Sequence, residues 1–409
     1  MSANDRVRLT KWMRASAVSA VLGLVPACSA DKDEDHGHHG GGVHMAELSD
    51  DLTKIYLTAS DKNRIAVVDT RSLGADTSPE GLKQRAYVVS RDSEEIAVID
   101  LRTLELVRKS DYQTLQQIPV GAHPTHLSLS RDGKLLAVMD EEEGAGAVSF
   151  IETATDREVK RLSGFQTPHY MRFAHDNAYG YVANIGAHHI TRVDMAKLEI
   201  DGHIPLDGFE VGKAAPDEGG FGDAQIDARG ILFAAHHASG RVLVYDTNVR
   251  EKRQDLVIGG NPWMAYAEHP FQNVIQRHLV TNFGQKSVQV IDAAATAPSV
   301  LGALPGDEES YGVNYSSRAP NKAFVMNRIR QDVAVVDMNT LNITKRIPVG
   351  GNTETAATTA DGKYIVATVS SANRVVIIDA ETDQIIKTFD GVGNYPWSVT
   401  IPGGQNYCH

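Results

Sequence analysis

One short motif recurs along the chain and constrains its fold more than any other feature. A run rich in β-branched residues closes on an acidic residue, as in Ile65-Ala-Val-Val-Asp69 and Val375-Val-Ile-Ile-Asp379. The eight closing acids are Asp69, Asp100, Glu152, Asp194, Asp246, Asp292, Asp337 and Asp379. Successive acids lie 31 to 52 residues apart. A repeat of roughly 40–50 residues that contains only strand patterns is typical of a β-propeller.

Each repeat is expected to contain four strands. Around Glu152 they cover residues 126–130, 135–139, 148–152 and 158–162. The closing acids need no catalytic role, because Asp side chains bond nearby backbone N–H groups and so begin turns. The composition agrees with a turn-rich β protein, since the chain has 35 glycines and only 6% aromatic residues.

The sequence therefore predicts an all-β propeller of four-stranded blades. Eight acid-ended runs favour eight blades. Seven blades plus an additional hairpin is the alternative, because only seven inner strands are clear and the first interval is short. We expect residues 71–85 to supply a shortened outer strand and an inner strand. The last run, 395–401, should pair with 54–58 and 64–69, so that N- and C-terminal strands close the ring and leave no exposed edge.

The N-terminus has the pattern of an export signal. Basic residues between 6 and 14 precede an apolar stretch, Ala15 to Ala27, whose 13 residues are too few to span a bilayer. The following Cys28 resembles the acylated cysteine of a lipoprotein. Cleavage near Ala27 or Ala30, which would leave a soluble periplasmic protein, is the alternative. Either signal predicts a periplasmic location, and acylation would make Cys28 a lipid anchor.

These boundaries divide the chain into three parts. We expect a signal peptide over 1–28, a mobile acidic His-rich tail over 29–48 and a single propeller domain over 49–409. We expect the protein to be a monomer.

The sixteen histidines fall mainly into two groups. One group lies in the tail: His36, His38, His39 and His44. The other recurs where the β motif turns over: His123, His126, His169, His188, His189, His236 and His237. Neutral imidazole is a common ligand of zinc. A His-rich tract binds metal weakly and exchanges it quickly, which suits capture; a solvated linker is the alternative.

The expected meander brings the second group together. The loop before an inner strand and the loop after the second strand lie at the same mouth of the central channel. Zinc takes about four N, O or S ligands at ~2.0–2.3 Å. The predicted Zn²⁺ ligands are His123, His169, Asp223 and His236, with His126 as the main substitute. His188, His189 and His237 are expected to contact the ligands or to form a transfer path.

Single histidines in loops are usually surface or hydrogen-bonding residues, so the prediction depends on how many occupy equivalent positions. The acidic run 141–143 lies at the same face, and we expect it to be a solvated turn.

Two resemblances follow from these residues. Tyr181-Val-Ala-Asn184, followed by an acid-ended strand, resembles the YVTN-type bacterial propellers over nearly the whole mature chain. The leader, the tail histidines and the His123, His169, Asp223, His236 set resemble the periplasmic zinc metallochaperones called AztD. That resemblance implies capture of Zn²⁺ and its transfer to the solute-binding protein of a zinc ABC transporter.

Other functions remain open at this stage. A net charge of −12 argues against nucleic acid as a partner. A heme-d1-related or other ligand-binding propeller is one alternative, although the chain has no Cys-x-x-Cys-His motif for covalent heme attachment. A lactonase-like or metal-assisted hydrolase is another, but no nucleophile motif is present and we do not expect an enzyme.

Overall fold

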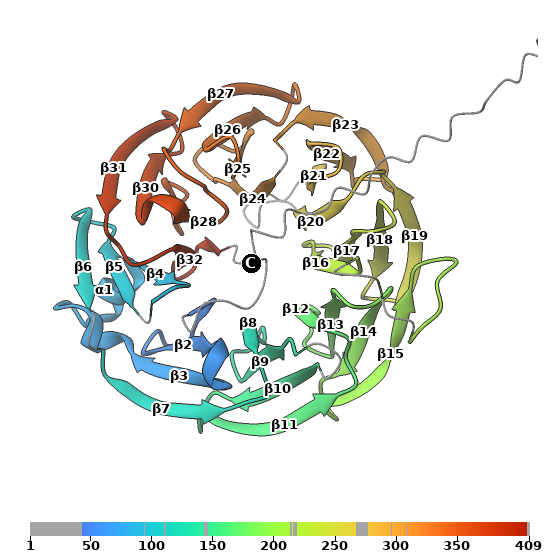
Figure 1. The fold of residues 1–409 in the computed structure, drawn as a ribbon, viewed down its shortest axis with the longest axis horizontal. Coiled ribbons are helices and arrows are strands. Elements are labelled where there is room, and N and C mark those ends of the chain that lie inside the picture. Colours follow the sequence, from blue (N-terminus) through green and yellow to red (C-terminus); the bar gives the residue numbers. More distant parts are fainter. Residues whose placement is uncertain are drawn as a thin grey trace, which may run out of the picture. The chain divides into compact units, whose positions relative to one another are not determined.

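The computed structural model describes residues 43–406, apart from 94, 110–111, 143–145, 213–214, 216–218, 267–276, 296 and 308. Within this part of the chain, eight antiparallel sheets form a closed ring, and their inner strands surround a common axis that we call the central channel (Figure 1). The predictions of a propeller, of four-stranded blades and of eight blades are confirmed. Among the described residues, no helix is long and apolar enough to cross a membrane.

Blades 2 to 6 each use four consecutive strands, numbered from the channel outward. Blade 2 is β8 (Pro124–Leu129), β9 (Leu135–Asp140), β10 (Ala147–Glu152) and β11 (Arg157–Ser163). Blade 3 is β12 (Pro168–Phe173), β13 (Tyr179–Asn184), β14 (His189–Asp194) and β15 (Glu199–Pro205). Blade 4 is β16 (Phe221–Ile226), β17 (Ile231–His236), β18 (Arg241–Asp246) and β19 (Glu251–Val257). Blade 5 is β20 (Pro262–Tyr266), β21 (Arg277–Asn282), β22 (Ser287–Asp292) and β23 (Ser299–Pro305). Blade 6 is β24 (Ser310–Tyr315), β25 (Lys322–Asn327), β26 (Asp332–Asp337) and β27 (Asn342–Pro348).

The remaining blades join the two ends of the chain. Blade 7 is β28 (Ala356–Thr358), β29 (Tyr364–Val369), β30 (Arg374–Asp379) and β31 (Gln384–Asp390), with β33 (Gln405–Asn406) added beside β28. Blade 8 takes its inner strand, β32 (Pro396–Thr400), from the C-terminal end and its others, β4 (Arg85–Ser90), β5 (Ile96–Asp100) and β6 (Glu105–Lys109), from the N-terminal half. Blade 1 is β1 (Ala46–Leu48), β2 (Lys54–Ala59), β3 (Arg64–Asp69) and β7 (Thr114–Pro119).

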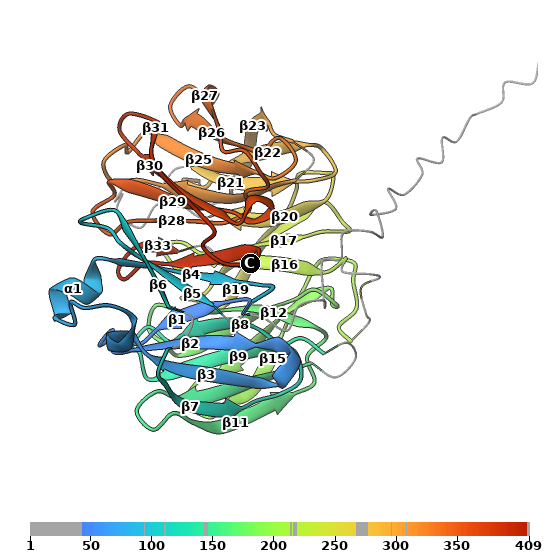
Figure 2. The ribbon, with the colours of Figure 1, turned by 60° about the vertical axis from the view of Figure 1, so that its left-hand side comes forward.

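Three details of the predicted closure are wrong. The C-terminal strand pairs with β4, and not with residues 54–58 or 64–69. Residues 71–85 supply no strand pair; they contain most of the 3-10 helix η2 (Thr70–Leu73) and the short helix α1 (Pro79–Lys83). The short first interval arises because the chain leaves blade 1 after β3, builds β4 to β6 in blade 8, and returns to add β7 (Figure 2).

The propeller also begins earlier than residue 49. β1 pairs with β2, and Val43 and Met45 are buried in the core. The predicted tail, 29–48, therefore includes the inner strand of blade 1. Two further 3-10 turns, η1 (Ser60–Lys62) and η3 (Ser370–Ala372), connect the second and third strands of blades 1 and 7.

Apolar side chains are buried mainly between neighbouring blades. One cluster joins Met264 and Leu279 of blade 5 to Val313 and Val325 of blade 6. The closing acids begin turns as predicted; Asp194, for example, accepts hydrogen bonds from the backbone N–H groups of residues 196 and 197. The ring therefore holds its inner strands in fixed positions around the channel.

Candidate metal site at the channel mouth

Inner strands start at one mouth of the channel, and six of them start with a β-bulge. In blade 3 the pairing jumps from Pro168 to Tyr170, which leaves His169 out of register. The same jump leaves Trp263 out of register in blade 5 and Trp397 in blade 8. A bulge bends the strand and redirects a side chain. Equivalent positions on separate blades therefore carry His169 and the two tryptophans.

The backbone before three of these strands has an unusual conformation. His123, Thr167 and Tyr395 each precede a proline and have φ of 55°, 49° and 55°. Positive φ is uncommon for residues other than glycine, and such residues cluster at binding sites. The turns that lead into these inner strands are therefore held in a strained form at the mouth.

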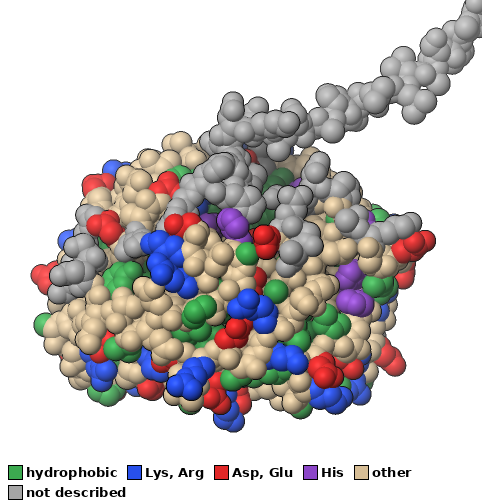
Figure 3. All heavy atoms as spheres, turned by 60° about the horizontal axis from the view of Figure 1, so that its bottom comes forward, with side chains coloured by type: hydrophobic (Ala, Val, Ile, Leu, Met, Phe, Trp, Pro, Cys, Tyr) green, Lys and Arg blue, Asp and Glu red, His purple; other side chains and the backbone are tan. Residues whose placement is uncertain are grey.

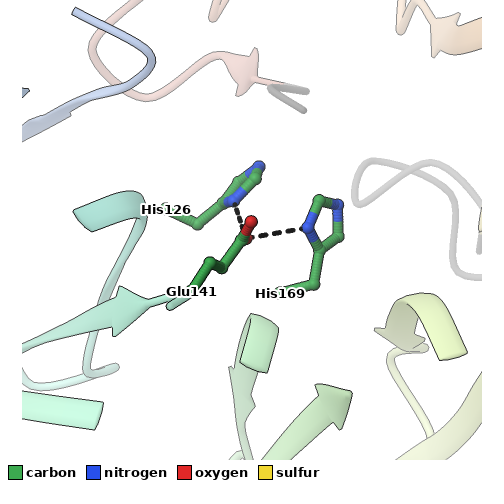
Figure 4. A group of neighbouring side chains, drawn as sticks. All are labelled: His126, Glu141 and His169. Carbon is green, nitrogen blue, oxygen red and sulfur yellow. Dashed lines mark hydrogen bonds and ion pairs between the residues drawn. The ribbon is translucent and has the colours of Figure 1, made fainter. Parts of the chain in front are cut away.

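Two histidines and one glutamate meet at this mouth on blades 2 and 3 (Figure 4). The Nδ1 atoms of His126 and His169 lie 3.0 and 2.8 Å from the same Oε1 atom of Glu141. The two imidazole rings are 4.3 Å apart between centroids. Each residue offers one ligand atom within 4.8 Å of the others. Among the described residues, this is the one group of three or more His, Cys, Asp or Glu side chains that could hold a metal ion.

The three groups carry charges suited to a cation. Burial alone would raise the pKa of the Glu141 carboxyl, but His169 and His126 beside it hold that pKa well below its usual range. Burial lowers the pKa of His126, and His169 lowers it further. An ionised carboxylate thus accepts N–H bonds from imidazoles at neutral pH. Within the described chain, the Nε2 atom of His126 is buried without a hydrogen-bond partner.

His44 approaches the same group from the segment just before β1, the inner strand of blade 1. Its backbone N–H donates to Thr58 Oγ1 at 3.1 Å. Burial lowers the pKa of its imidazole to about 3, and the charges of His126 and Glu141 also act on it. The prediction that His44 belongs to a mobile tail is therefore wrong, because it belongs to the propeller and lies close to the site.

Three of the predicted ligands lie outside this group. His123 is half-buried in the preceding turn, where its N–H donates to Asn63 Oδ1 at 3.1 Å. Asp223 is fully buried, and its carboxylate accepts from the Ala224 N–H and the Gln225 amide. His236 of blade 4 pairs with His188 of blade 3.

The residues predicted to contact the ligands, namely His188, His189 and His237, also lie outside this group. His189 packs edge-to-face on His203, with ring centroids 4.4 Å apart. His237 packs on Trp263, with centroids 5.3 Å apart. Figure 3 shows histidine side chains near the centre of this face and also to one side of it. His36, His38, His39 and Cys28 lie outside the described residues.

Glu141 is the residue of this candidate site that the sequence did not predict. It was expected to be part of a solvated acidic turn, yet its side chain is only 11% exposed and lies between two imidazoles. The available signal was its position. Glu141 directly follows the second strand of its blade, as His237 does in blade 4.

The other half of the mouth is aromatic and cationic. Trp263 stacks on Phe283, and Phe283 contacts Tyr311. The guanidinium of Arg328 lies 6.0 Å from the Tyr311 ring centroid, and its Nε lies 3.0 Å from the buried Glu354 carboxylate. In blade 8, Arg91 lies 4.1 Å over the Tyr395 ring, which stacks on Trp397.

The fold and this mouth define the chain as an eight-bladed β-propeller. Residues 273–395 match the family model of the cytochrome D1 heme domain, which is less than half of the chain. No curated protein matches the chain.

Many solved structures share the fold. Dihydro-heme d1 dehydrogenase NirN, in complex with DHE, is 14% identical over 78% of this chain and 76% of its own, with a TM-score of 0.50. A candidate 6-phosphogluconolactonase from Bacteroides fragilis is 15% identical over 77% of this chain and 97% of its own, with a TM-score of 0.58. Sqt1 from Saccharomyces cerevisiae is 8% identical over 88% of this chain and 87% of its own, with a TM-score of 0.64. At these identities the likeness concerns the fold alone.

Proposed function

We propose that the protein is a periplasmic metallochaperone that carries Zn²⁺ at the channel mouth. It would hand the ion to the solute-binding protein of a zinc ABC transporter. The observation that carries the proposal is the convergence of His126, Glu141 and His169, whose ligand atoms lie within 4.8 Å of one another. Two imidazoles and a carboxylate are ligands that zinc commonly takes.

His44 is the candidate for the fourth ligand. Burial keeps its imidazole neutral, and it comes from blade 1, whereas the other three belong to blades 2 and 3. A shell made entirely of protein ligands leaves no position for a reactive water, which suits storage and transfer better than hydrolysis. Export and the His-rich tail, both predicted from the sequence, agree with a protein that collects metal outside the cytoplasm.

Metal analysis of matched variants tests this proposal. The full chain with tail histidines 36, 38 and 39 changed to alanine would be dialysed against a weak chelator and analysed for zinc. We expect about one tightly held Zn²⁺ per chain, and its loss in His126→Ala and His169→Ala. His175→Ala is the matched control, because that exposed histidine bonds the Asp227 carbonyl at 2.8 Å, outside the group. Tight zinc that survives both ligand substitutions would refute the site.

Transfer needs its own measurement. The zinc-loaded protein would be mixed with the apo solute-binding protein of a zinc transporter, and the two would be separated by size. Transfer that is faster than spontaneous release into a chelator supports the chaperone role; equal rates would contradict it.

A heme-d1-related ligand-binding propeller is the second candidate, and the comparisons favour it. The matched region, 273–395, contains Phe283, Tyr311, Arg328 and Tyr395, which belong to the aromatic and cationic half of the mouth. Stacked rings suit a planar ligand, and the Arg91 guanidinium over the Tyr395 ring suits a carboxylate on that ligand. Arg328 is paired with Glu309 and Glu354. Titration of the purified protein with hemin decides: a saturable Soret shift at one equivalent favours this candidate, and an unshifted band excludes it.

A further inference from the structure

A second set of imidazoles lies between blades 3 and 4, outside the His126, Glu141 and His169 group. His188 and His189 follow the turn after β13, and His236 ends β17. All three are buried, with exposures of 9%, 4% and 0%. The second strands of both blades end at the channel-mouth face. Two neighbouring blades thus bring histidines together at a second place on this face. We call His188 and His236 the rim pair and their location the rim.

The rim pair has the spacing of two metal ligands. His188 Nδ1 and His236 Nε2 are 2.9 Å apart. An ion bound at about 2.0–2.1 Å from each nitrogen would span that gap with an N–metal–N angle near 90°, and opening it to about 3.3 Å would reach the tetrahedral angle. The two nitrogens therefore need to separate by only about 0.4 Å to reach tetrahedral geometry around an ion.

The proton between the two rings has another place to go. The backbone N–H of Ser239 donates to His236 Nδ1 at 3.3 Å, so the ring proton of His236 sits on Nε2 and points at His188. When an ion takes Nε2, that proton can move to Nδ1, where the Ser239 hydroxyl oxygen lies 2.9 Å away. The Ser239 backbone N–H thus stabilises the tautomer with the proton on Nε2, and its hydroxyl oxygen can accept from the tautomer with the proton on Nδ1. The His236 ring stays neutral in both.

Two further histidines, His189 and His203, follow His188 in blade 3. His189 is adjacent to His188 in sequence and packs on His203, which is exposed on the outer strand β15. The Nδ1 atom of His189 is buried and has no hydrogen-bond partner within the described residues. This run of histidines extends from the rim pair to the outer surface of blade 3.

We propose that His188 and His236 form a second binding site for a divalent transition metal, with Ser239 as a positioning residue. The ions expected are those that favour nitrogen ligands, namely Cu²⁺, Ni²⁺ and Zn²⁺. With two ligands in place and no carboxylate, the rim site binds more weakly than a site with two imidazoles and a glutamate. It does not depend on the channel-mouth site, because none of its residues belongs to that group.

Copper titration of the full chain tests the rim site. The background carries alanine at the tail histidines 36, 38 and 39, and Cu²⁺ binding is followed by calorimetry and by electron paramagnetic resonance, which detects coordinated nitrogen. We expect two equivalents in the background and one in His188→Ala, which loses the nitrogen coupling of the weaker site. His175→Ala is the control and should keep both. His188→Gln, which retains a polar partner for His236, guards against a folding defect.

Two outcomes overturn the rim site. The first is two equivalents with unchanged spectra in both His188 variants. The second is loss of all bound copper in a His126→Ala and His169→Ala double variant, since the rim site should survive there. Ser239→Ala should weaken only the weaker equivalent. If the double variant instead retains both equivalents, the proposed channel-mouth site fails while the rim assignment stands.

Discussion

The two halves of the channel mouth share one backbone design and differ in chemistry. On blades 1 to 3 the mouth carries three histidines around one carboxylate, that of Glu141. The histidines are His44, His126 and His169. On blades 5, 6 and 8, the bulged positions that correspond to His169 carry Trp263, Tyr311 and Trp397. The difference teaches that the bulged strand start fixes where a side chain goes, whereas residue identity alone decides what it can bind. One ring can thus offer a metal site and a stacking surface side by side.

The two halves meet at Trp263. Its ring centroid lies 6.2 Å from that of His169 and 5.3 Å from that of His237. Substitutions on either side of this residue therefore test whether the halves act separately.

The largest effect is expected from Glu141→Gln. This change keeps the shape but removes the charge that both imidazoles face. Loss of an outer-shell partner costs 10–100-fold in affinity, and loss of a ligand costs at least as much, so we expect zinc affinity to fall by about 100-fold. Competition with a fluorescent chelator measures it. Trp263→Ala is the comparison and should leave zinc affinity unchanged; an equal loss in both would show that the halves are not separate.

A smaller effect is expected from Trp397→Ala, and it should fall on the affinity for a planar ligand instead of on the affinity for zinc. Loss of one aromatic stacking partner costs about 1 kcal/mol, which lowers the affinity for a planar ligand such as hemin roughly fivefold. Zinc affinity should not change. The two affinities are measured by Soret titration and by chelator competition. Weaker zinc binding in this variant would contradict the division of the mouth.

Acid should separate the mouth from the tail. Burial lowers the pKa of His126, so protons compete for this ligand only below the ordinary imidazole range. Imidazoles without such burial have pKa values of about 6.5 and are protonated first as the pH falls. Between pH 7.5 and 5.5, zinc affinity should therefore fall less for the protein without tail histidines than for a peptide of residues 29–42. A steeper fall for the protein would contradict a buried, neutral site.

The smallest effect concerns a carboxyl group that has no imidazole partners. Burial raises the pKa of Glu47 on β1 to about 7, and Arg172 lowers it only in part. The folded chain therefore holds this proton more tightly than the unfolded chain, and folding stability falls as the pH rises from about 4.5 to 7. Glu47→Gln should remove that loss, so its melting temperature should exceed that of the parent by a few degrees at pH 8 and converge with it at pH 5. A constant difference across this range would be contrary to expectation.

The sequence predicted the repeating part of the fold well and the closure poorly. Eight acid-ended strands indicated eight blades because each closing acid marks a local turn. The pairing of β32 with β4 could not be deduced, since all inner-strand patterns are alike and their partners lie far away in sequence. The return of the chain to add β7 was hidden for the same reason.

The site shows a similar limit. The sequence placed histidines at the right mouth, and His126 and His169 do meet there. It could not choose between His123 and His126, because a bulge at Pro124 shifts the register by one residue and a one-residue shift moves a side chain to the other face. Asp223 was predicted as a ligand in place of Glu141, because the packing of neighbouring blades decides which carboxylate faces the histidines.

The origin of blade 8 in both chain ends has a consequence for the order of events during synthesis. The strands β4 to β6 are made early, yet their inner partner, β32, is made only after blades 2 to 7. All the histidines of both proposed metal sites exist long before the ring can close. The mouth therefore takes its final form only after β32 has been made, and a metal ion or planar ligand that needs the closed ring cannot be loaded before then.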